Sequence, residues 1–258
     1  DEGDEEVEEV ERAMEDWFKI VPMKTDKSKI KLRGAMKSGI IAPHPNRTIL
    51  NGCSGSGKTV LLVNLLTNKR LYGDYYDMVV IMSLTANILD DSYAEIKKKS
   101  KKTKIVIINK LDASIIEDIM KTNLDIIEEK GTHRAPKILL ILDDCICDTS
   151  FMKSDSVSKI FVMGRHHSCS VWLATQRFAS VPRVARLQAS QLFLFKCTGS
   201  EIKTLVDEFK PANFKRREFE NVVHYATRDD YTFLNINMHV PSKLRFRRNL
   251  DEILELNK

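Results

Sequence analysis

Cysteine is sparse in this sequence, and no hydrophobic run is long enough to cross a membrane. The cysteines are odd in number and lack the paired spacing of a disulfide framework or a zinc knuckle. They are Cys53, Cys145, Cys147, Cys169 and Cys197. A membrane span needs roughly 20 apolar residues, which no segment approaches, and the N-terminal region is acidic, unlike a secretory signal. We therefore expect a soluble intracellular protein with reduced thiols and no membrane span.

Charge is unevenly distributed along the chain. Residues 1–16 contain ten acidic residues and one arginine, a net charge of −9, so the rest of a chain with a total of +5 carries +14. A basic body with an acidic arm fits a protein that meets a polyanion, and an acidic terminus without a role fits equally well. The chain is 43% hydrophobic, enough for one sizeable core. We expect an acidic, irregular arm over 1–39 and one domain over 40–258 that ends in a basic extension.

Short apolar runs alternate with stretches of helical period along this domain. The predicted strands are Thr48–Asn51, Met78–Met82, Ile105–Ile108, Ile138–Leu142, Val171–Ala174 and Leu192–Phe195, and the predicted helices are Thr59–Leu66, Ser114–Glu129, Ser156–Met163 and Glu201–Phe209. Such alternation predicts an α/β fold with a mostly parallel sheet and helices on both faces. We also expect a C-terminal β-hairpin from Val222–Ala226 and Tyr231–Ile236, and a final helix over 251–256.

A glycine-rich motif joins the first strand to the first helix. It reads Gly52-Cys53-Ser54-Gly55-Ser56-Gly57-Lys58-Thr59 and satisfies G-x-x-x-x-G-K-[ST] in full. The glycines let backbone N–H groups close around phosphates, Lys58 is suited to reach the β- and γ-phosphate oxygens, and the Thr59 hydroxyl is suited to ligate Mg²⁺. Because the motif lies between a strand and a helix, we predict that these eight residues bind ATP and Mg²⁺.

Two acidic residues end the apolar run Ile138–Leu142. We expect Asp143 to orient Mg²⁺ from a neighbouring strand, which leaves Asp144 free to polarise an attacking water. This pair is typical of hydrolytic motors rather than of small-molecule kinases, although an acidic strand end can also cap the following turn. Gln176 follows the strand Val171–Ala174, and we expect it to hydrogen-bond the γ-phosphate and the lytic water.

A second nucleotide signature is present but in the wrong order. Residues Asn109-Lys110-Leu111-Asp112 match the N-K-x-D motif by which GTPases read guanine. In those proteins the motif follows a D-x-x-G metal site, whereas here it precedes Asp143-Asp144-Cys145-Ile146, which has no glycine. The order argues against a GTPase.

Five segments together resemble the FtsK–HerA superfamily of P-loop motors. They are Gly52–Thr59, Leu142–Asp144, Gly164–His167, Leu173–Arg177 and Val181–Arg186, in this order. The likeness is to the genome-packaging ATPases of nucleocytoplasmic large DNA viruses, including the poxvirus type, and it covers about residues 45–200. It implies a RecA-like P-loop NTPase core, ATP hydrolysis, and homo-oligomeric rings, usually of six, that thread double-stranded DNA. Asp144 stands where many cellular relatives have glutamate.

The resemblance also implies an arginine that reaches the γ-phosphate held by the neighbouring subunit. Arg165, Arg183 and Arg186 are candidates by likeness, and Arg186 is favoured. Each of them is about as well suited to a salt bridge at the edge of the core. The predicted catalytic set is therefore Lys58, Asp144, Gln176, Arg186 and Arg165.

Basic residues gather in the segments Lys97–Lys104, Lys215–Arg217 and Lys243–Arg248. Such charge suits sequence-independent contact with a DNA backbone, and alternation over Leu244–Arg247 predicts arginines on one face of a strand. The lysine run is equally consistent with a solvated surface loop. No base-reading module is evident.

Together with these residues, the resemblance implies an ATP-hydrolysing double-stranded DNA translocase that packages a viral genome into a capsid. We expect it in the virion or in a viral factory of the host cytoplasm, with a capsid or portal-like protein as a further partner. The alternatives are a cellular HerA-like or helicase-type ATPase that processes DNA, and a nucleotide-dependent scaffold with little turnover. A nucleotide kinase is a weaker alternative because of the acid pair.

Overall fold

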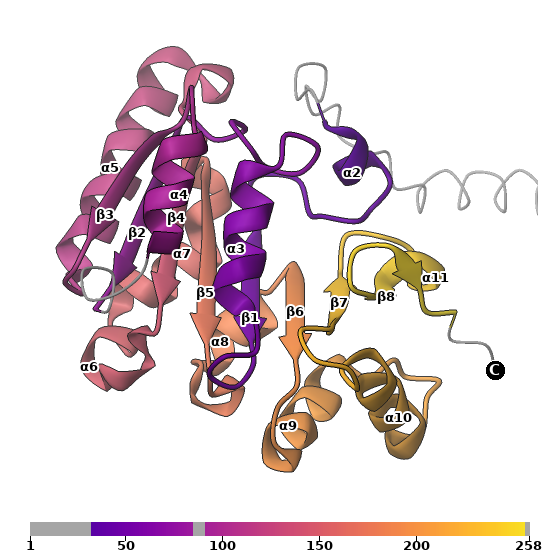
Figure 1. Cartoon of the computed structure of the whole chain (residues 1–258). Helices are drawn as coiled ribbons and strands as arrows, with labels where there is room; N and C mark the ends of the chain where they lie inside the picture. The colour runs from indigo at the N-terminus through magenta and orange to yellow at the C-terminus, as the bar shows by residue number, and fades with distance from the viewer. Residues whose placement is uncertain (1–31, 85–90, 256–258) are drawn as a thin grey trace, which may run out of the picture. The chain divides into compact units, whose positions relative to one another are not determined.

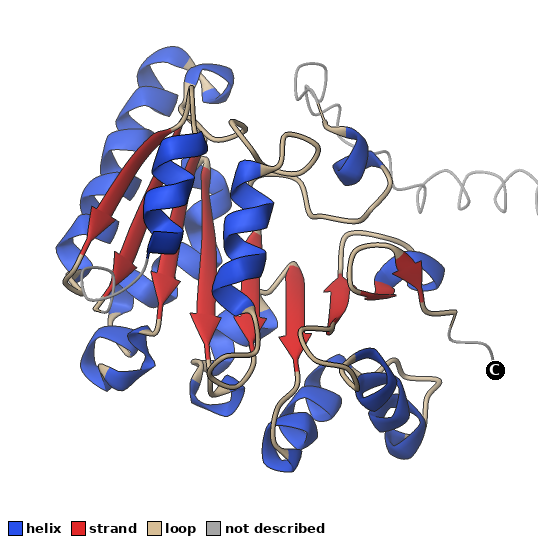
Figure 2. Cartoon of the chain, viewed as in Figure 1, coloured by secondary structure: helices blue, strands red, loops and turns tan. Residues whose placement is uncertain are grey.

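A computed structural model describes residues 32–84 and 91–255 of the chain. They contain one sheet with the strand order β3-β2-β4-β5-β1-β6-β7-β8-β9, drawn in red in Figure 2. The strands are β1 (Arg47–Asn51), β2 (Met78–Ser83), β3 (Lys104–Ile108), β4 (Ile138–Asp143), β5 (Cys169–Thr175), β6 (Gln191–Phe195), β7 (Phe233–Asn237), β8 (Phe246–Arg248) and β9 (Glu252–Ile253). From β3 to β6 all neighbours pair in parallel, and β7, β8 and β9 continue the sheet in antiparallel pairing.

Helices cover both faces of this sheet. One face packs against α2 (Gly34–Lys37), α3 (Lys58–Thr67) and α4 (Asp91–Lys99), and α3 and α4 lie in front of the strands in Figure 1. The other face packs against α5 (Ala113–Lys130), α7 (Asp155–Met163), α8 (Arg183–Leu187), α9 (Gly199–Phe209) and α10 (Arg216–Ala226). Shorter elements are α6 (Thr149–Met152), α11 (Ser242–Arg245) and the 3-10 turns η1 (Thr132–Arg134), η2 (Cys145–Cys147), η3 (Gly164–His167) and η4 (Phe178–Ser180). The predicted layered α/β fold is confirmed.

The apolar run of β4 explains why helices must cover both faces of the sheet. Successive side chains of a strand point to opposite faces, so Leu139 and Ile141 join the cluster under α3 and α4 while Leu140 and Leu142 join the cluster under the other helices. All four side chains are fully buried. A strand buried on both faces requires a continuous apolar run, as central strands of parallel sheets have.

The antiparallel C-terminal extension exists, but one of its predicted strands is wrong. Val222–Ala226 is the end of helix α10, not a strand. Phe219, Val223 and Ala226 are buried on one side of this helix, and their spacing of four and three residues is the helical period. The β-branched pair Val222-Val223 suggested a strand because the window was too short to reveal that period. The partners of β7 are β6 and β8.

Two further predictions at the C-terminus are corrected. The predicted final helix is replaced by β9, in which Ile253 pairs with Arg247 of β8, and residue 256 lies outside the described part. The predicted strand over Leu244–Arg247 begins only at Phe246, because α11 ends at Arg245. Arg247 is 6% exposed and donates to the Ser38 carbonyl oxygen at 3.3 Å. The arginines therefore do not form one exposed row.

The predicted arm over 1–39 lies mostly outside the described residues, including the acidic segment 1–16. Its last residues contact the core. The Arg33 guanidinium donates to the carbonyl oxygens of Lys69 and Leu71 at 2.7 and 2.9 Å, and Met36 of α2 is buried. The boundary at residue 40 stays a prediction, and residues 33–39 pack with the domain that follows.

Candidate active site

The loop between β1 and α3 has the shape of a phosphate cradle. Gly55 and Gly57 have φ angles of 72° and 102°, which L side chains rarely adopt. A Cβ atom added at Gly52 would lie 2.6 Å from Cβ of Phe195, so the backbone passes β6 too closely for a side chain. The glycines of the motif are therefore required by the conformation of the loop itself.

The backbone of this loop offers donors to an anion. The N–H groups of Ser54, Gly55, Gly57, Lys58 and Thr59 make no hydrogen bond to any residue in the described part of the chain. They lie at the N-terminus of the ten-residue helix α3, whose first turn contains no acidic residue. Unpaired N–H groups and the positive end of the helix dipole together favour phosphate binding.

Lys58 lies inside the loop and is 8% exposed. Its ammonium donates to the carbonyl oxygens of Gly52 and Cys53 at 2.8 and 2.9 Å. Burial lowers the pKa of Lys58, and the carboxylates of Asp144 and Asp143 act in the opposite direction. The lysine is therefore held in the loop and is electrostatically coupled to both acids that follow β4.

The two acids have different environments. Asp143 ends β4, is 7% exposed, and accepts a hydrogen bond from the Tyr93 hydroxyl of α4. Asp144 has a φ of 50°, in the left-handed region that aspartate tolerates better than most residues, and its N–H donates to the Ala174 carbonyl oxygen at 3.2 Å. The turn directs the two carboxylates into different surroundings, one buried and one partly exposed.

Gln176 follows β5 and contacts Asp144. Its Nε2 donates to Oδ1 of Asp144 at 3.4 Å, a long hydrogen bond between exposed groups. Strand β5 lies between β4 and β1, so Asp143 is two strands away from the phosphate loop rather than on an adjacent strand. The carboxyl ends of parallel strands meet at one edge of the sheet, where open α/β sheets bind ligands. Lys58, Asp143, Asp144 and Gln176 all lie at that edge.

The candidate arginines lie elsewhere. Arg186 is bound on both sides: its Nε and Nη2 donate to the Glu208 carboxylate at 2.7 to 3.0 Å, and its Nη1 donates to the carbonyl oxygens of Ala179 and Val181 at 3.0 and 2.7 Å. Arg165 is exposed in η3, before the start of β5, and its charge acts on Arg47 at the start of β1. Arg165 therefore lies at the amino ends of the parallel strands, whereas the phosphate loop lies at their carboxyl ends.

The three basic segments differ in how many of their side chains form ion pairs with acidic residues. Arg216 pairs with Asp207 and Glu220, and Arg248 pairs with Asp229 and Glu252. By contrast, Lys97 and Lys98 at the end of α4 form no ion pair with any described residue and are exposed. The lysine run is thus the basic segment with the most available charge.

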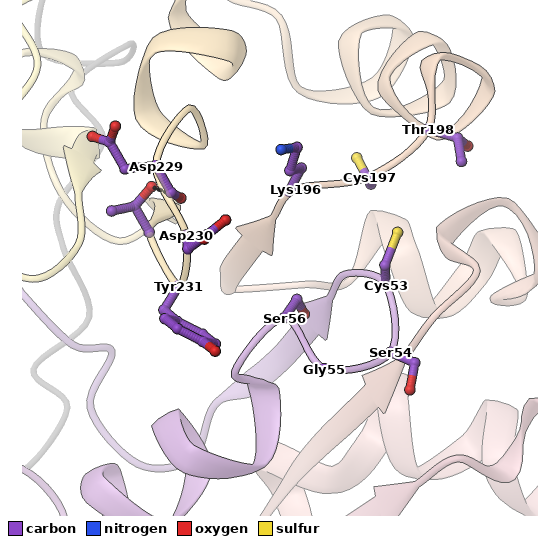
Figure 3. A pocket seen from close by; sticks show the side chains of 11 residues that line it. Cys53, Ser54, Gly55, Ser56, Lys196, Cys197, Thr198, Asp229, Asp230 and Tyr231 are labelled. Atoms are coloured by element: carbon purple, nitrogen blue, oxygen red, sulfur yellow. Dashed lines mark hydrogen bonds between the residues drawn. The ribbon is translucent and has the colours of Figure 1, made fainter.

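The structure also brings residues to the site that carried no signal in the sequence. Tyr93 is one of them, and the loop Asp229–Thr232 before β7 is another. This loop, the segment Lys196–Thr198 after β6 and residues Cys53–Ser56 enclose a cavity of about 430 Å³, shown in Figure 3. The sequence gives no sign that this loop reaches the site, because 169 residues separate it from the phosphate motif.

Two kinds of feature are absent from residues 32–84 and 91–255. No group of three or more histidine, cysteine, aspartate or glutamate side chains there is arranged to hold a metal ion. None of the helices in these ranges is long and apolar enough to span a bilayer.

Comparisons with known proteins agree with this geometry. Residues 37–238 match the model of the family described as Poxvirus A32 protein. No curated protein matches the sequence. Among solved structures, the fold is similar to the genome-packaging NTPase B204 of Sulfolobus turreted icosahedral virus 2, with 16% identity, a TM-score of 0.53, and coverage of 83% of this chain and 99% of that one.

Two more solved structures share the fold. The DNA-packaging ATPase B204 of Sulfolobus turreted icosahedral virus is 15% identical, with a TM-score of 0.53 over 76% of this chain and 94% of that one. The cytoplasmic domain of the type VII secretion ATPase EccC from Thermomonospora curvata is 13% identical, with a TM-score of 0.51 over 76% of this chain and 24% of that one. These likenesses show a RecA-like P-loop ATPase core.

Proposed function

The chain belongs to the poxvirus A32 protein family, and we propose that it is a genome-packaging ATPase that moves double-stranded DNA into a viral capsid. One observation carries the hydrolytic part of this proposal: Asp144 and Gln176 meet beside a phosphate loop in which five N–H groups are unpaired among the described residues. The packaging part is supported by the family and by the similarity in fold to B204, which is described as a genome-packaging NTPase and a DNA-packaging ATPase.

The residues divide the work of hydrolysis as follows. The loop N–H groups hold the phosphates, and Lys58 shifts from the loop carbonyls to the β- and γ-phosphate oxygens. Asp144 accepts a proton from the attacking water, and Gln176 orients that water against the γ-phosphorus. The bond between the γ-phosphorus and the β,γ-bridging oxygen breaks, which releases ADP and inorganic phosphate.

The donor set at the sheet edge fits Mg²⁺. This ion prefers oxygen ligands and keeps several waters when it is bound by one or two protein groups and substrate phosphates. Asp143 and the Thr59 hydroxyl are oxygen donors of this kind, and the buried Tyr93 contact fixes the carboxylate of Asp143. When bound, Mg²⁺ would neutralise charge on the phosphates. This requirement of few protein ligands also agrees with the lack of a three-residue metal cluster among the described residues.

We further propose a homo-oligomeric ring, usually of six, in which an arginine of one subunit reaches the nucleotide of the next. Arg186 is held by Glu208, so the exposed Arg165 and Arg183 are better placed for such a contact. For DNA, the exposed lysines of Lys97–Lys104 are the best candidate surface, although Lys99 among them pairs with Glu95. A capsid or portal-like partner and a location in the virion or viral factory complete the proposal.

Steady-state ATP hydrolysis with and without long double-stranded DNA, at low and moderate salt, tests this function. We expect DNA to raise the turnover rate, salt to reduce that stimulation because phosphate contacts release counterions, and Asp144→Asn to abolish turnover while nucleotide binding persists. Turnover that is equally low in the wild type and in Asp144→Asn would instead indicate a nucleotide-dependent scaffold.

A double variant at Lys97 and Lys98 tests the DNA surface. Changing both to alanine should reduce DNA stimulation and flatten its salt dependence while the rate without DNA stays the same. Changing the paired Arg216 to alanine is the matched control, since its charge is already engaged. Equal loss in both variants would contradict the assignment of the lysine run.

A further inference from the structure

The direction in which a nucleotide must lie follows from the order of the strands. Lys58 reaches the β- and γ-phosphates in this type of loop, and the loop backbone holds the α- and β-phosphates. Asp144 and Gln176 follow β4 and β5, on one side of β1. The γ-phosphate therefore points to the β4 and β5 side. The nucleoside must extend to the other side of β1, toward β6 and β7.

An unusually exposed aromatic side chain lies on that side. Tyr231, in the loop before β7, is 72% exposed, although it contacts the phosphate loop: a Cβ atom at Gly57 would lie 3.3 Å from its Cδ1 atom. Figure 3 shows its ring extending from the 229–232 loop toward the phosphate loop. A solvent-exposed aromatic ring beside a phosphate-binding loop provides a surface for a nucleobase, because every base can stack on such a ring.

Tyr231 also forms part of an apolar hollow of about 590 Å³ at the first turn of α3. Its walls include Gly57, Val60, Phe195, Tyr231, Phe233 and Leu250. Val60, in this first turn, is 62% exposed. Ligand sites are commonly concave, apolar and aromatic with a few polar groups. The hollow begins where the phosphate loop ends, so a ligand held by its phosphates can reach it.

The conformation of the loop is fixed by several contacts. Tyr231 has a φ of 61°, which is a genuine outlier for a bulky residue. The Asp229 carbonyl oxygen accepts from both the N–H and the hydroxyl of Thr232, at 3.3 and 2.8 Å, and the Asp229 carboxylate pairs with Arg228 and Arg248. Strained backbone persists only where the surroundings determine it, and it is common at ligand sites.

We propose that Tyr231 is the platform on which the nucleobase stacks, with the base seated in the apolar hollow beside Val60. This inference rests on the proposed function, and it adds the nucleoside end of a site whose phosphate end is described above. Stacking uses the face of the ring rather than the phenol oxygen. A purine of either kind should therefore bind, and the binding of the triphosphate group alone should not depend on Tyr231.

Isothermal titration calorimetry of the full chain with Mg²⁺ and two probes tests this proposal. The probes are the non-hydrolysable ATP analogue AMPPNP, which has a base, and inorganic tripolyphosphate, which has none. The variants are Tyr231→Ala and the matched control Tyr231→Phe, which keeps the ring. We expect Tyr231→Ala to weaken AMPPNP binding by about 5- to 150-fold and to leave tripolyphosphate binding unchanged, and we expect Tyr231→Phe to bind both probes like the wild type.

The other outcomes separate the two proposals. Unchanged AMPPNP binding in Tyr231→Ala would overturn stacking. Equal weakening of both probes would also overturn it, because it would mean that Tyr231 only supports Gly57 and the phosphate loop. If the wild type bound neither probe, the proposed ATPase function itself would fail, and Tyr231 would not be at issue.

Discussion

The ion pair between Arg186 of α8 and Glu208 of α9 offers a direct test of what this arginine does. The two side chains are 11% and 13% exposed, so the pair is largely desolvated. Two guanidinium nitrogens face the carboxylate, and the third donates to the carbonyl oxygens of Ala179 in η4 and of Val181, which follows η4. Arg186 also lies over the ring of Phe178, 5.6 Å from the ring centre.

Removing one partner of such a pair leaves a buried charge without compensation, which costs about 3–5 kcal/mol. We therefore expect Arg186→Ala to lower the free energy of unfolding by about that amount, and Glu208→Ala to cause a similar loss. The double variant should lose less than the sum of the two, because each single change removes the same interaction. Arg183→Ala, an exposed arginine on the same helix, is the control and should change stability by less than about 0.5 kcal/mol.

Urea unfolding monitored by circular dichroism gives these energies, and ATP hydrolysis is measured on the same samples. An arginine that acts in trans on a neighbour's nucleotide would behave differently. If Arg186→Ala unfolded like the wild type but lost hydrolysis, and Glu208→Ala kept it, the structural reading of this pair would be refuted.

Three other predictions concern the loop, a buried histidine and a glycine. N-ethylmaleimide should modify the exposed thiols of Cys53 and Cys147. Peptide mass mapping should show that Mg²⁺ and AMPPNP together protect only Cys53 from modification. Protection of both cysteines would contradict the assigned site. Burial, with a smaller contribution from Lys137, lowers the pKa of His44 to about 3, so the unfolded chain binds an extra proton below about pH 6.5. Stability should therefore fall by up to ~1.4 kcal/mol per pH unit as the pH drops toward 3, and His44→Gln should reduce this slope in urea titrations. Gly52→Ala should abolish AMPPNP binding in calorimetry because the added Cβ would clash with Phe195. The control Gly199→Ala should bind AMPPNP like the wild type, because no atom lies within 4 Å of a Cβ added there. Wild-type binding by Gly52→Ala would contradict this prediction and show that the loop can adjust.

The conformation of the candidate phosphate loop could be predicted from the sequence because its signals are local. The eight-residue motif, its strand and its helix are contiguous in the sequence. Strand β4 is likewise indicated by five consecutive apolar residues before Asp143. The same local reasoning predicted a strand wrongly at Val222–Ala226. This segment is short and contains two β-branched residues, and the helical period of α10 is evident only over a longer stretch.

Contacts between distant segments could not be predicted in this way. Nothing in the sequence pairs Arg186 with Glu208, or Tyr93 with Asp143, because these contacts depend on how α8 and α9, and α4 and β4, pack in three dimensions. Tyr231 is a similar case. Its importance follows from the antiparallel pairing of β7 with β6, which brings the loop before β7 to the phosphate loop.

Movement along DNA can be measured in a triplex-displacement assay, in which a labelled third strand is released when a motor moves along double-stranded DNA. We expect release that requires ATP, stops with AMPPNP, and is lost in Asp144→Asn although that variant still binds nucleotide. DNA-stimulated ATP hydrolysis by the wild type without any strand release would contradict the proposal that this protein moves along DNA.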